Sequence, residues 1–148
     1  MIHEVQKLEK ETLISKLAEF FKSREYVELA YLFGSTAENK RGPLSDVDIG
    51  VYFSNRLTKN EKMEKRFELT SELAALLKTD KIDLVSMNDA SPVINFEIIK
   101  PIVPVFVRDE DLKLDVEQKI MSCYLDRKYH ENLLNRVFLE RIHKKGGF

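Results

Sequence analysis

The sequence predicts an α/β (α+β) fold: a small mixed sheet of about four strands flanked by helices, with C-terminal helices. Short apolar runs rich in β-branched and aromatic residues alternate with longer stretches of helical periodicity. The chain has 148 residues, enough for one core, and its 43% hydrophobic and 33% charged residues are typical of a globular protein. We therefore expect a single domain over residues 1–148, with an α/β core over about 1–108 and a helical tail over about 109–148.

The first elements are predicted from spacing. Residues 4–23 place leucine, isoleucine and phenylalanine at helical intervals, which predicts an amphipathic helix that packs on the sheet. The apolar, aromatic run 27–33 is typical of a buried strand. Residues 46–53 alternate between polar or small and apolar side chains, which predicts a strand with two unlike faces.

A helix and a third strand are expected next. Thr58 followed by Glu61 matches a capping box, so a helix is expected to begin there and to end near residue 78. Its core-facing stripe is expected to consist of Met63, Phe67, Thr70, Ala74 and Leu77. Residues 82–86 are short and apolar, with Asp83 inside the run, and they predict the third strand.

The last part of the chain is expected to contain helices around one more strand. Ser91-Pro92 is a helix-start pattern for a short helix ending near residue 99, and Pro104 places a fourth strand, 102–107, at a sheet edge. A helix over about 109–125 would bury Cys123 as a small hydrophobe. After an expected break near 126–129 the helical pattern continues, and this tail either packs on the domain or presents an apolar face to a partner.

Composition excludes several classes of protein. The net charge of −1 provides no strong basic field, so direct binding of nucleic acid is not expected. A single cysteine excludes an internal disulfide and is typical of a reducing compartment. No signal peptide or apolar run of ~20 residues is visible. We expect a cytoplasmic protein that does not cross a membrane.

Two carboxylates open the predicted second strand. Asp46 and Asp48 are two residues apart, so strand geometry directs both side chains to one face. Neighbouring anions repel and raise each other's pKa. A cation bound between them relieves this repulsion, and Mg²⁺ prefers such oxygen ligands together with phosphate oxygens.

Gly34-Ser35 follows the predicted first strand directly. Glycine lets backbone approach a ligand closely, and N–H groups beside a hydroxyl bind phosphate oxygens. Asp83 adds a third carboxylate in another strand. It is either solvated at a sheet edge or directed at a metal shared with the first two, because an unpaired carboxylate in a core is costly. The upstream motif favours the metal.

Gly34-Ser35, ten further residues and then Asp46-Val47-Asp48 resemble the signature of the DNA polymerase β-like nucleotidyltransferase superfamily. More narrowly, the chain resembles the minimal nucleotidyltransferase (MNT) domains, of the MntA type, that pair with HEPN proteins in toxin–antitoxin modules. The resemblance implies catalytic and metal-binding roles for Asp46, Asp48 and Asp83, with two Mg²⁺ ions. It implies nucleotide binding by Gly34, Ser35, Arg41 and Ser45.

One position departs from the family pattern. Relatives often carry an arginine three residues after the serine, where this chain has Glu38. A glutamate does not bind phosphate in place of arginine, so Arg41 is expected to contact the nucleotide from further along the loop. Lys40 and Arg41 are otherwise a solvated charge pair.

The resemblance implies an antitoxin that transfers AMP from ATP to a tyrosine of a HEPN ribonuclease toxin. Two alternatives stay open on the sequence. One is a degenerate MNT module that neutralises its partner by binding alone, a reading that Glu38 supports. The other is a nucleotidyltransferase that acts on a small molecule such as an aminoglycoside, although such enzymes usually carry an additional helical domain.

Overall fold

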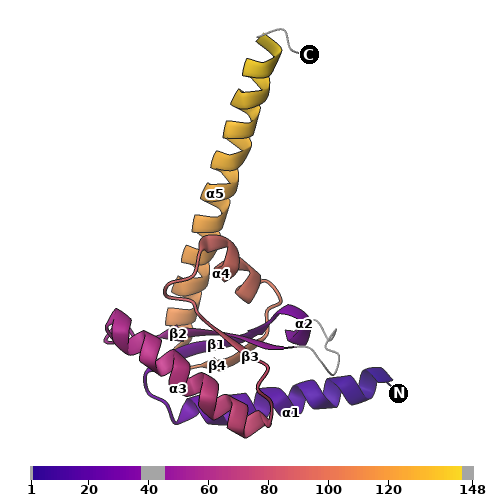
Figure 1. Cartoon of the computed structure of the whole chain (residues 1–148), viewed down its shortest axis with the longest axis vertical. Helices are drawn as coiled ribbons and strands as arrows, with labels where there is room; N and C mark the ends of the chain where they lie inside the picture. The colour runs from indigo at the N-terminus through magenta and orange to yellow at the C-terminus, as the bar shows by residue number, and fades with distance from the viewer. Residues whose placement is uncertain (1, 38–45, 145–148) are drawn as a thin grey trace.

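The computed structural model describes residues 2–37 and 46–144 and has the expected fold class. Helices cover both faces of a central sheet, and the last helix extends far beyond it (Figure 1). The elements follow the order α1 (Ile2–Lys22), β1 (Val27–Phe33), α2 (Gly34–Ala37), β2 (Val47–Phe53), α3 (Lys59–Leu77), β3 (Ile82–Ser86), α4 (Pro92–Ile99), β4 (Pro104–Val107) and α5 (Glu110–Lys144).

The sheet is mixed and has the strand order β3-β2-β1-β4. β1 pairs antiparallel with both β2 and β4, whereas β2 and β3 are parallel and are joined through α3. This order puts the two strands that carry carboxylates, β2 and β3, side by side. It also places β4 at an edge, which confirms the position that Pro104 predicts.

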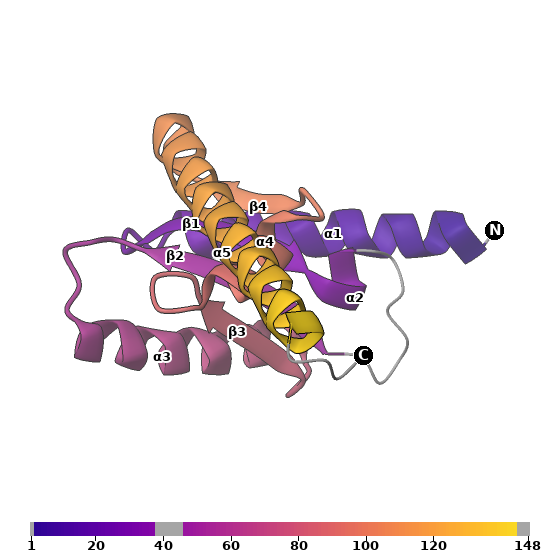
Figure 2. The ribbon, with the colours of Figure 1, turned by 90° about the horizontal axis from the view of Figure 1, so that it is seen from above.

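Alternation along the strands separates two apolar clusters. One face of the sheet packs on α1 and α3, and its largest cluster includes Leu17, Phe21, Ile49, Leu69 and Leu73, all fully buried. The other face packs on α4 and α5 through Tyr31, Ile98, Val116 and Ile120. Figure 2, seen from above, shows α5 lying over α4 and the strands on this second face.

Both predicted helix starts are confirmed. The Thr58 side chain accepts a hydrogen bond from the Glu61 N–H at 3.2 Å, and the Glu61 carboxylate accepts one from the Thr58 N–H at 3.1 Å. This reciprocal pair satisfies two backbone donors at the start of α3. Ser91 caps α4 by accepting from the Ile94 N–H, and Pro92 takes the first helical position.

The expected core stripe of α3 was right at Leu77, which packs against the core, and wrong at its two largest residues. Met63 is 53% exposed and Phe67 is 66% exposed, whereas Leu69 and Leu73 are fully buried. The two buried leucines are one turn apart, and Lys62 and Lys65 are half-buried whereas Met63 is exposed. A long lysine side chain can bury its methylenes and keep its charge in water, so a lysine in the pattern does not mark the solvent side of a helix.

The expected break in the C-terminal helix was also wrong, since α5 runs without interruption from Glu110 to Lys144. Its sequence contains neither glycine nor proline, so the polar run 126–129 interrupts the apolar pattern but not the helix. Cys123 is exposed rather than buried. Ile120 is the last buried residue of α5, and Cys123, one turn further along, lies outside the apolar cluster. Over the described ranges, no helix combines the length and apolarity needed to cross a bilayer.

Candidate active site

Strand register brings two of the predicted carboxylates together. Asp48 of β2 is paired with Asp83 of the parallel neighbour β3, so the two side chains occupy adjacent positions on one face. On its other side Asp48 is paired with Phe33, the last residue of β1. Sequence alternation places both carboxylates on the face that packs on α4 and α5.

Asp46 lies one residue before β2 and is exposed, whereas Asp48 is half-buried and Asp83 is exposed. Burial raises the pKa of Asp48, and the negative charges of Asp83 and Asp46 raise it further. The three carboxylates are therefore close enough for their charges to interact. Such mutual repulsion is the electrostatic condition that a bound cation would relieve.

Gly34 positions the backbone directly against Asp48. It begins α2 with a φ of +64°, a left-handed conformation that L-residues adopt at a cost. A Cβ on Gly34 would lie 2.3 Å from Oδ2 of Asp48, so a side chain there must displace the carboxylate. Glycine is thus required at this position both for the turn and for the close approach.

α2 is supported from the opposite layer. Nζ of Lys10, on α1, donates a hydrogen bond of 2.7 Å to the carbonyl of Ala37, the last residue of α2. This contact ties the end of the Gly34-Ser35 turn to α1. No sequence pattern predicted this contact, because a lysine on a surface helix is usually solvated.

Of the other predicted nucleotide contacts, the backbone of Ser35 lies in α2, directly after Gly34. Arg41 and Ser45 lie outside the described residues. The structure therefore brings together Gly34, Asp48 and Asp83, with Asp46 beside them in the chain.

The donor chemistry at this site is that of a hard cation. Carboxylate oxygens on neighbouring strands suit Mg²⁺, which takes one or two protein carboxylates and completes its shell with water and phosphate. Within residues 2–37 and 46–144, no group of three or more His, Cys, Asp or Glu side chains is already arranged as a metal cage.

α4 closes one side of the site. Gly50 follows Asp48 on the same face of β2, and a Cβ there would lie 2.5 Å from Cγ2 of Ile98. Beyond this contact a cavity of about 370 Å³ is lined by Tyr52, Asn95, Lys119 and others, but by none of the predicted site residues. The carboxylates and this cavity are therefore separate places on one sheet face.

A family profile described as "Polymerase beta, Nucleotidyltransferase" matches residues 15–111. This range begins in α1 and ends in the first turn of α5, so it contains every predicted site residue. No curated protein matches the chain.

Solved structures share the fold over most of the chain. A toxin–antitoxin complex with AMP-PNP aligns with a TM-score of 0.65 at 24% identity, covering 84% of this chain and 98% of the other. An MntA–HepT toxin–antitoxin complex gives 0.59 and 25%, covering 89% and 98%. A tri-AMPylated Shewanella oneidensis HEPN toxin in complex with MNT antitoxin gives 0.57 and 24%, covering 90% and 98%. The chain belongs to the polymerase β nucleotidyltransferase family, and its structural neighbours are MNT antitoxin complexes.

Proposed function

We propose that this protein is an antitoxin with protein adenylyltransferase activity, which transfers AMP from ATP to a tyrosine of a HEPN ribonuclease toxin. The observation that carries the proposal is the pairing of Asp48 with Asp83 directly beside the Gly34 turn. A backbone turn beside adjacent carboxylates is the arrangement that nucleotidyl transfer needs, because phosphates and the cation that accompanies them require both.

The chain's own residues have distinct roles in this reaction. Backbone N–H groups of the Gly34-Ser35 turn bind phosphate oxygens of ATP, and Arg41 and Ser45 add contacts to the nucleotide. Asp46, Asp48 and Asp83 would hold Mg²⁺, which would supply charge neutralisation for the transferred phosphoryl group. Asp83 is the most accessible carboxylate of the paired strands and is suited to accept the proton of the acceptor hydroxyl.

The reaction balances as a substitution at the α-phosphorus. The tyrosine oxygen forms a bond to that phosphorus, and the bond from the same phosphorus to the bridging oxygen breaks. Pyrophosphate leaves, and the tyrosine proton passes to a carboxylate. The contribution of the protein is chiefly to position the reactants, as is usual for phosphoryl transfer.

Two findings support a protein acceptor. The neighbours include an AMPylated HEPN toxin bound to an MNT antitoxin and a complex with AMP-PNP. The matched family region ends at the start of α5, so the fold has no second substrate domain within the described residues, only a projecting helix. This arrangement suits an acceptor that is itself a protein and can dock through its own surface.

Label transfer tests the proposal. The protein is incubated with Mg²⁺ and ATP labelled at the α-phosphate, with and without a HEPN-type protein, taken first from the neighbouring reading frame. We expect label on that protein, and at least a ~10²-fold loss with Asp46→Asn or Asp48→Asn, the size typical of removing one group that stabilises the transition state. Asp115→Asn, an exposed change on α5, is the matched control and should transfer normally.

Neutralisation by binding alone is the second candidate, and Glu38 favours it because it stands where relatives often carry an arginine. The two functions separate in cells that express the toxin. If Asp48→Asn still protects those cells as well as the wild type does, binding suffices. Loss of both protection and label supports transfer. A wild-type protein that neither labels nor binds the neighbour contradicts both.

A further inference from the structure

The two halves of α5 have different surroundings. In the proximal half, residues 110–124, Val116 and Ile120 are buried. The Tyr31 hydroxyl donates a 2.7 Å hydrogen bond to Glu117, and the rings of Phe96 and Tyr124 stack with their centroids 4.0 Å apart. These contacts to β1 and α4 hold the helix at a fixed angle to the sheet.

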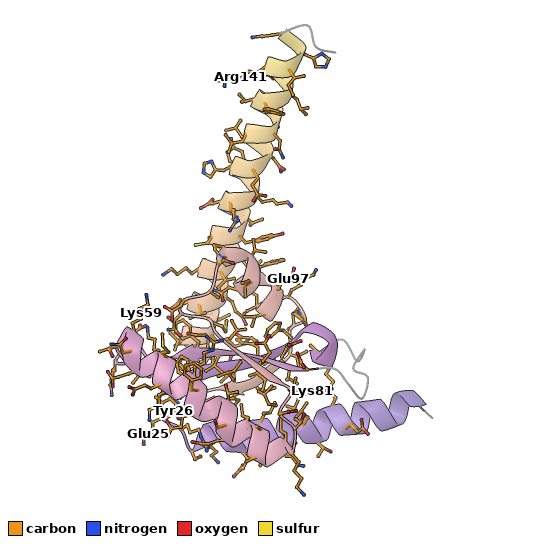
Figure 3. The ribbon with its side chains drawn as sticks, in the orientation of Figure 1. Glu25, Tyr26, Lys59, Lys81, Glu97 and Arg141 are labelled. Carbon is orange, nitrogen blue, oxygen red and sulfur yellow. The ribbon has the colours of Figure 1, made fainter. Side chains whose placement is uncertain are left out.

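The distal half, residues 125–144, projects away from the body. Every residue from Leu125 to Arg141 is exposed. Figure 3 shows labelled Arg141 near the end of this projection, remote from the sheet and the other helices. Leu134 lies 14 residues beyond the last buried residue, Ile120, which is roughly 20 Å along a helix.

Large apolar side chains are exposed around this projection, and one group of them lies on the side that continues from the buried part of α5. Leu134 is 68% exposed and Phe138 is 64% exposed, and they are one turn apart. Together with Val137, they form what we call the distal face. Large exposed apolar side chains grouped on a helix that packs against nothing often mark an interaction site.

The distal face points to the same side as the body. Leu134 is 18 residues beyond Val116, and Phe138 is 18 residues beyond Ile120, which is about five whole turns in each case. Residues separated by whole turns lie on the same side of a straight helix. A protein seated on the distal face would therefore stand above α4, on the sheet face that carries Asp48 and Asp83 (Figures 1 and 2).

Charge helps to choose between a second copy and a different protein. Residues 126–144 contain five Lys or Arg and three Asp or Glu, whereas the whole chain has a net charge of −1. Two copies paired segment to segment would bring net positive surfaces together, which opposes that mode of self-association. A partner with an apolar groove and an acidic rim has the complementary charge, and helix-in-groove binding uses anchors at such spacing.

We propose that the distal face of α5 is the docking helix for the acceptor protein, and that it holds the acceptor over the carboxylate face of the sheet. This inference rests on the proposed function for the identity of the acceptor. The inference adds to the proposed function the surface that selects the acceptor. That surface is a helix of this chain, and it fits an apolar groove with an acidic rim on the acceptor. Selection of the acceptor and transfer of AMP are then performed by different parts of the molecule.

A pair of matched variants tests the docking face. Leu134→Asp/Phe138→Asp changes the distal face, and Leu125→Asp/Leu139→Asp changes residues of similar exposure, 60% and 59%, on the opposite side of the helix. Leu125 lies nine residues before Leu134, which is about two and a half turns. Circular dichroism and thermal melting first check that both variants fold like the wild type.

The readouts are labelling of the HEPN-type protein against its concentration, and its binding to immobilised chain. With the distal-face variant we expect the half-saturating concentration to rise at least about tenfold, with the maximal rate retained, because an anchor is lost while the catalytic groups remain. The opposite-side variant should behave like the wild type. Equal labelling curves for the two variants overturn the proposal.

Two further outcomes separate docking from transfer. If the wild type binds the neighbour through the distal face but transfers no label, docking stands and the transferase proposal falls. If sedimentation shows that the isolated wild-type chain is a dimer that only the distal-face variant disrupts, and labelling is unaffected, the occupant is a second copy and the proposal is overturned.

Discussion

At the scale of single residues, Asp48 is placed at a cost to stability. It lies in a central strand between the Gly34 turn and Asp83, and it is half-buried. Burial and two neighbouring negative charges all raise its pKa, so all three disfavour the ionised form. A carboxylate held under these conditions is typical of a functional site, because a purely structural position would favour a neutral side chain.

The sign of this effect gives a prediction for metal-free protein. A carboxyl group with a raised pKa favours folding when it is protonated, and this contribution is lost as pH rises through the raised pKa. Asp48→Asn should therefore raise the melting temperature at pH 7 in EDTA, and the difference should shrink as the pH falls toward 3.8, the ordinary pKa of an aspartate. Scanning calorimetry at several pH values measures it.

Two additions make this measurement decisive. Asp115→Asn, exposed on α5, should leave the melting temperature unchanged at every pH. Mg²⁺ with ATP should stabilise the wild type and have little effect on Asp48→Asn. A variant less stable than the wild type at pH 7 in EDTA would show that Asp48 serves the fold rather than a ligand.

Gly34 provides a second prediction at this scale. Gly34→Ala should destabilise the fold by about 1–2 kcal/mol from the left-handed backbone alone, and it should also displace the Asp48 carboxylate. Gly50→Ala is the matched control, because its new methyl group meets the Ile98 side chain instead. Both variants should unfold more easily in urea, but only Gly34→Ala should lose ATP binding in titration calorimetry. Equal ATP affinities of the Gly34→Ala and Gly50→Ala variants would show that Gly34 is not part of the ATP-binding site.

At the scale of elements, local sequence signals predicted where two helices begin. Long-range packing determined which side of each helix is buried. The Thr58–Glu61 and Ser91-Pro92 patterns were confirmed because a cap depends on neighbours within one turn. The core stripe of α3 was confirmed only in part, because Leu69 and Leu73 were selected by the sheet that the helix covers. When a helix carries two apolar stripes, the spacing of residues within the helix does not show which stripe packs on the rest of the protein.

The candidate site divides in the same way. Alternation within one strand predicted Asp46 and Asp48 on one side; β2 begins at Val47, and the charge of Asp46 is one cause of the raised pKa of Asp48. Asp83 is the cross-strand neighbour of Asp48 because of the β2–β3 register. Only the family resemblance predicted that Asp83 would join the other two carboxylates. The hydrogen bond from Lys10 to α2 joins residues 27 positions apart, and no local sequence pattern predicts it.

The anchor of α5 supplies a prediction at this scale. Tyr31 is 1% exposed, and its hydroxyl donates to Glu117. Tyr31→Phe removes the donor but keeps the ring, so we expect a loss of about 1–3 kcal/mol in the free energy of unfolding, as for hydrogen bonds to charged groups. Tyr129→Phe, on the exposed half of α5, should cost nothing measurable. Urea titrations compare the two, and equal stabilities would mean that the bond does not secure the helix.

At the scale of the whole molecule, a packed body and an unsupported helix are joined in one element. The body buries two apolar clusters on either side of the sheet, whereas residues 125–141 of α5 contribute to neither. Most helical stability in proteins comes from tertiary packing, which this part of α5 lacks. The distal half is therefore expected to open locally in the free chain while the body remains folded.

Hydrogen exchange tests this expectation and the docking proposal together. In the free protein, backbone amides of residues 125–144 should exchange quickly, whereas those around Val116 and Ile120 should be protected by the core. When the HEPN-type protein is added, protection should spread along the distal half, because bound side chains hold the helix. Amides of α3 serve as the internal control, since α3 lies on the opposite face of the sheet and should not change. Slow exchange beyond Leu125 in the free chain would mean that the projection is stable alone, whereas a complex that leaves those amides unprotected would place the acceptor elsewhere on the molecule.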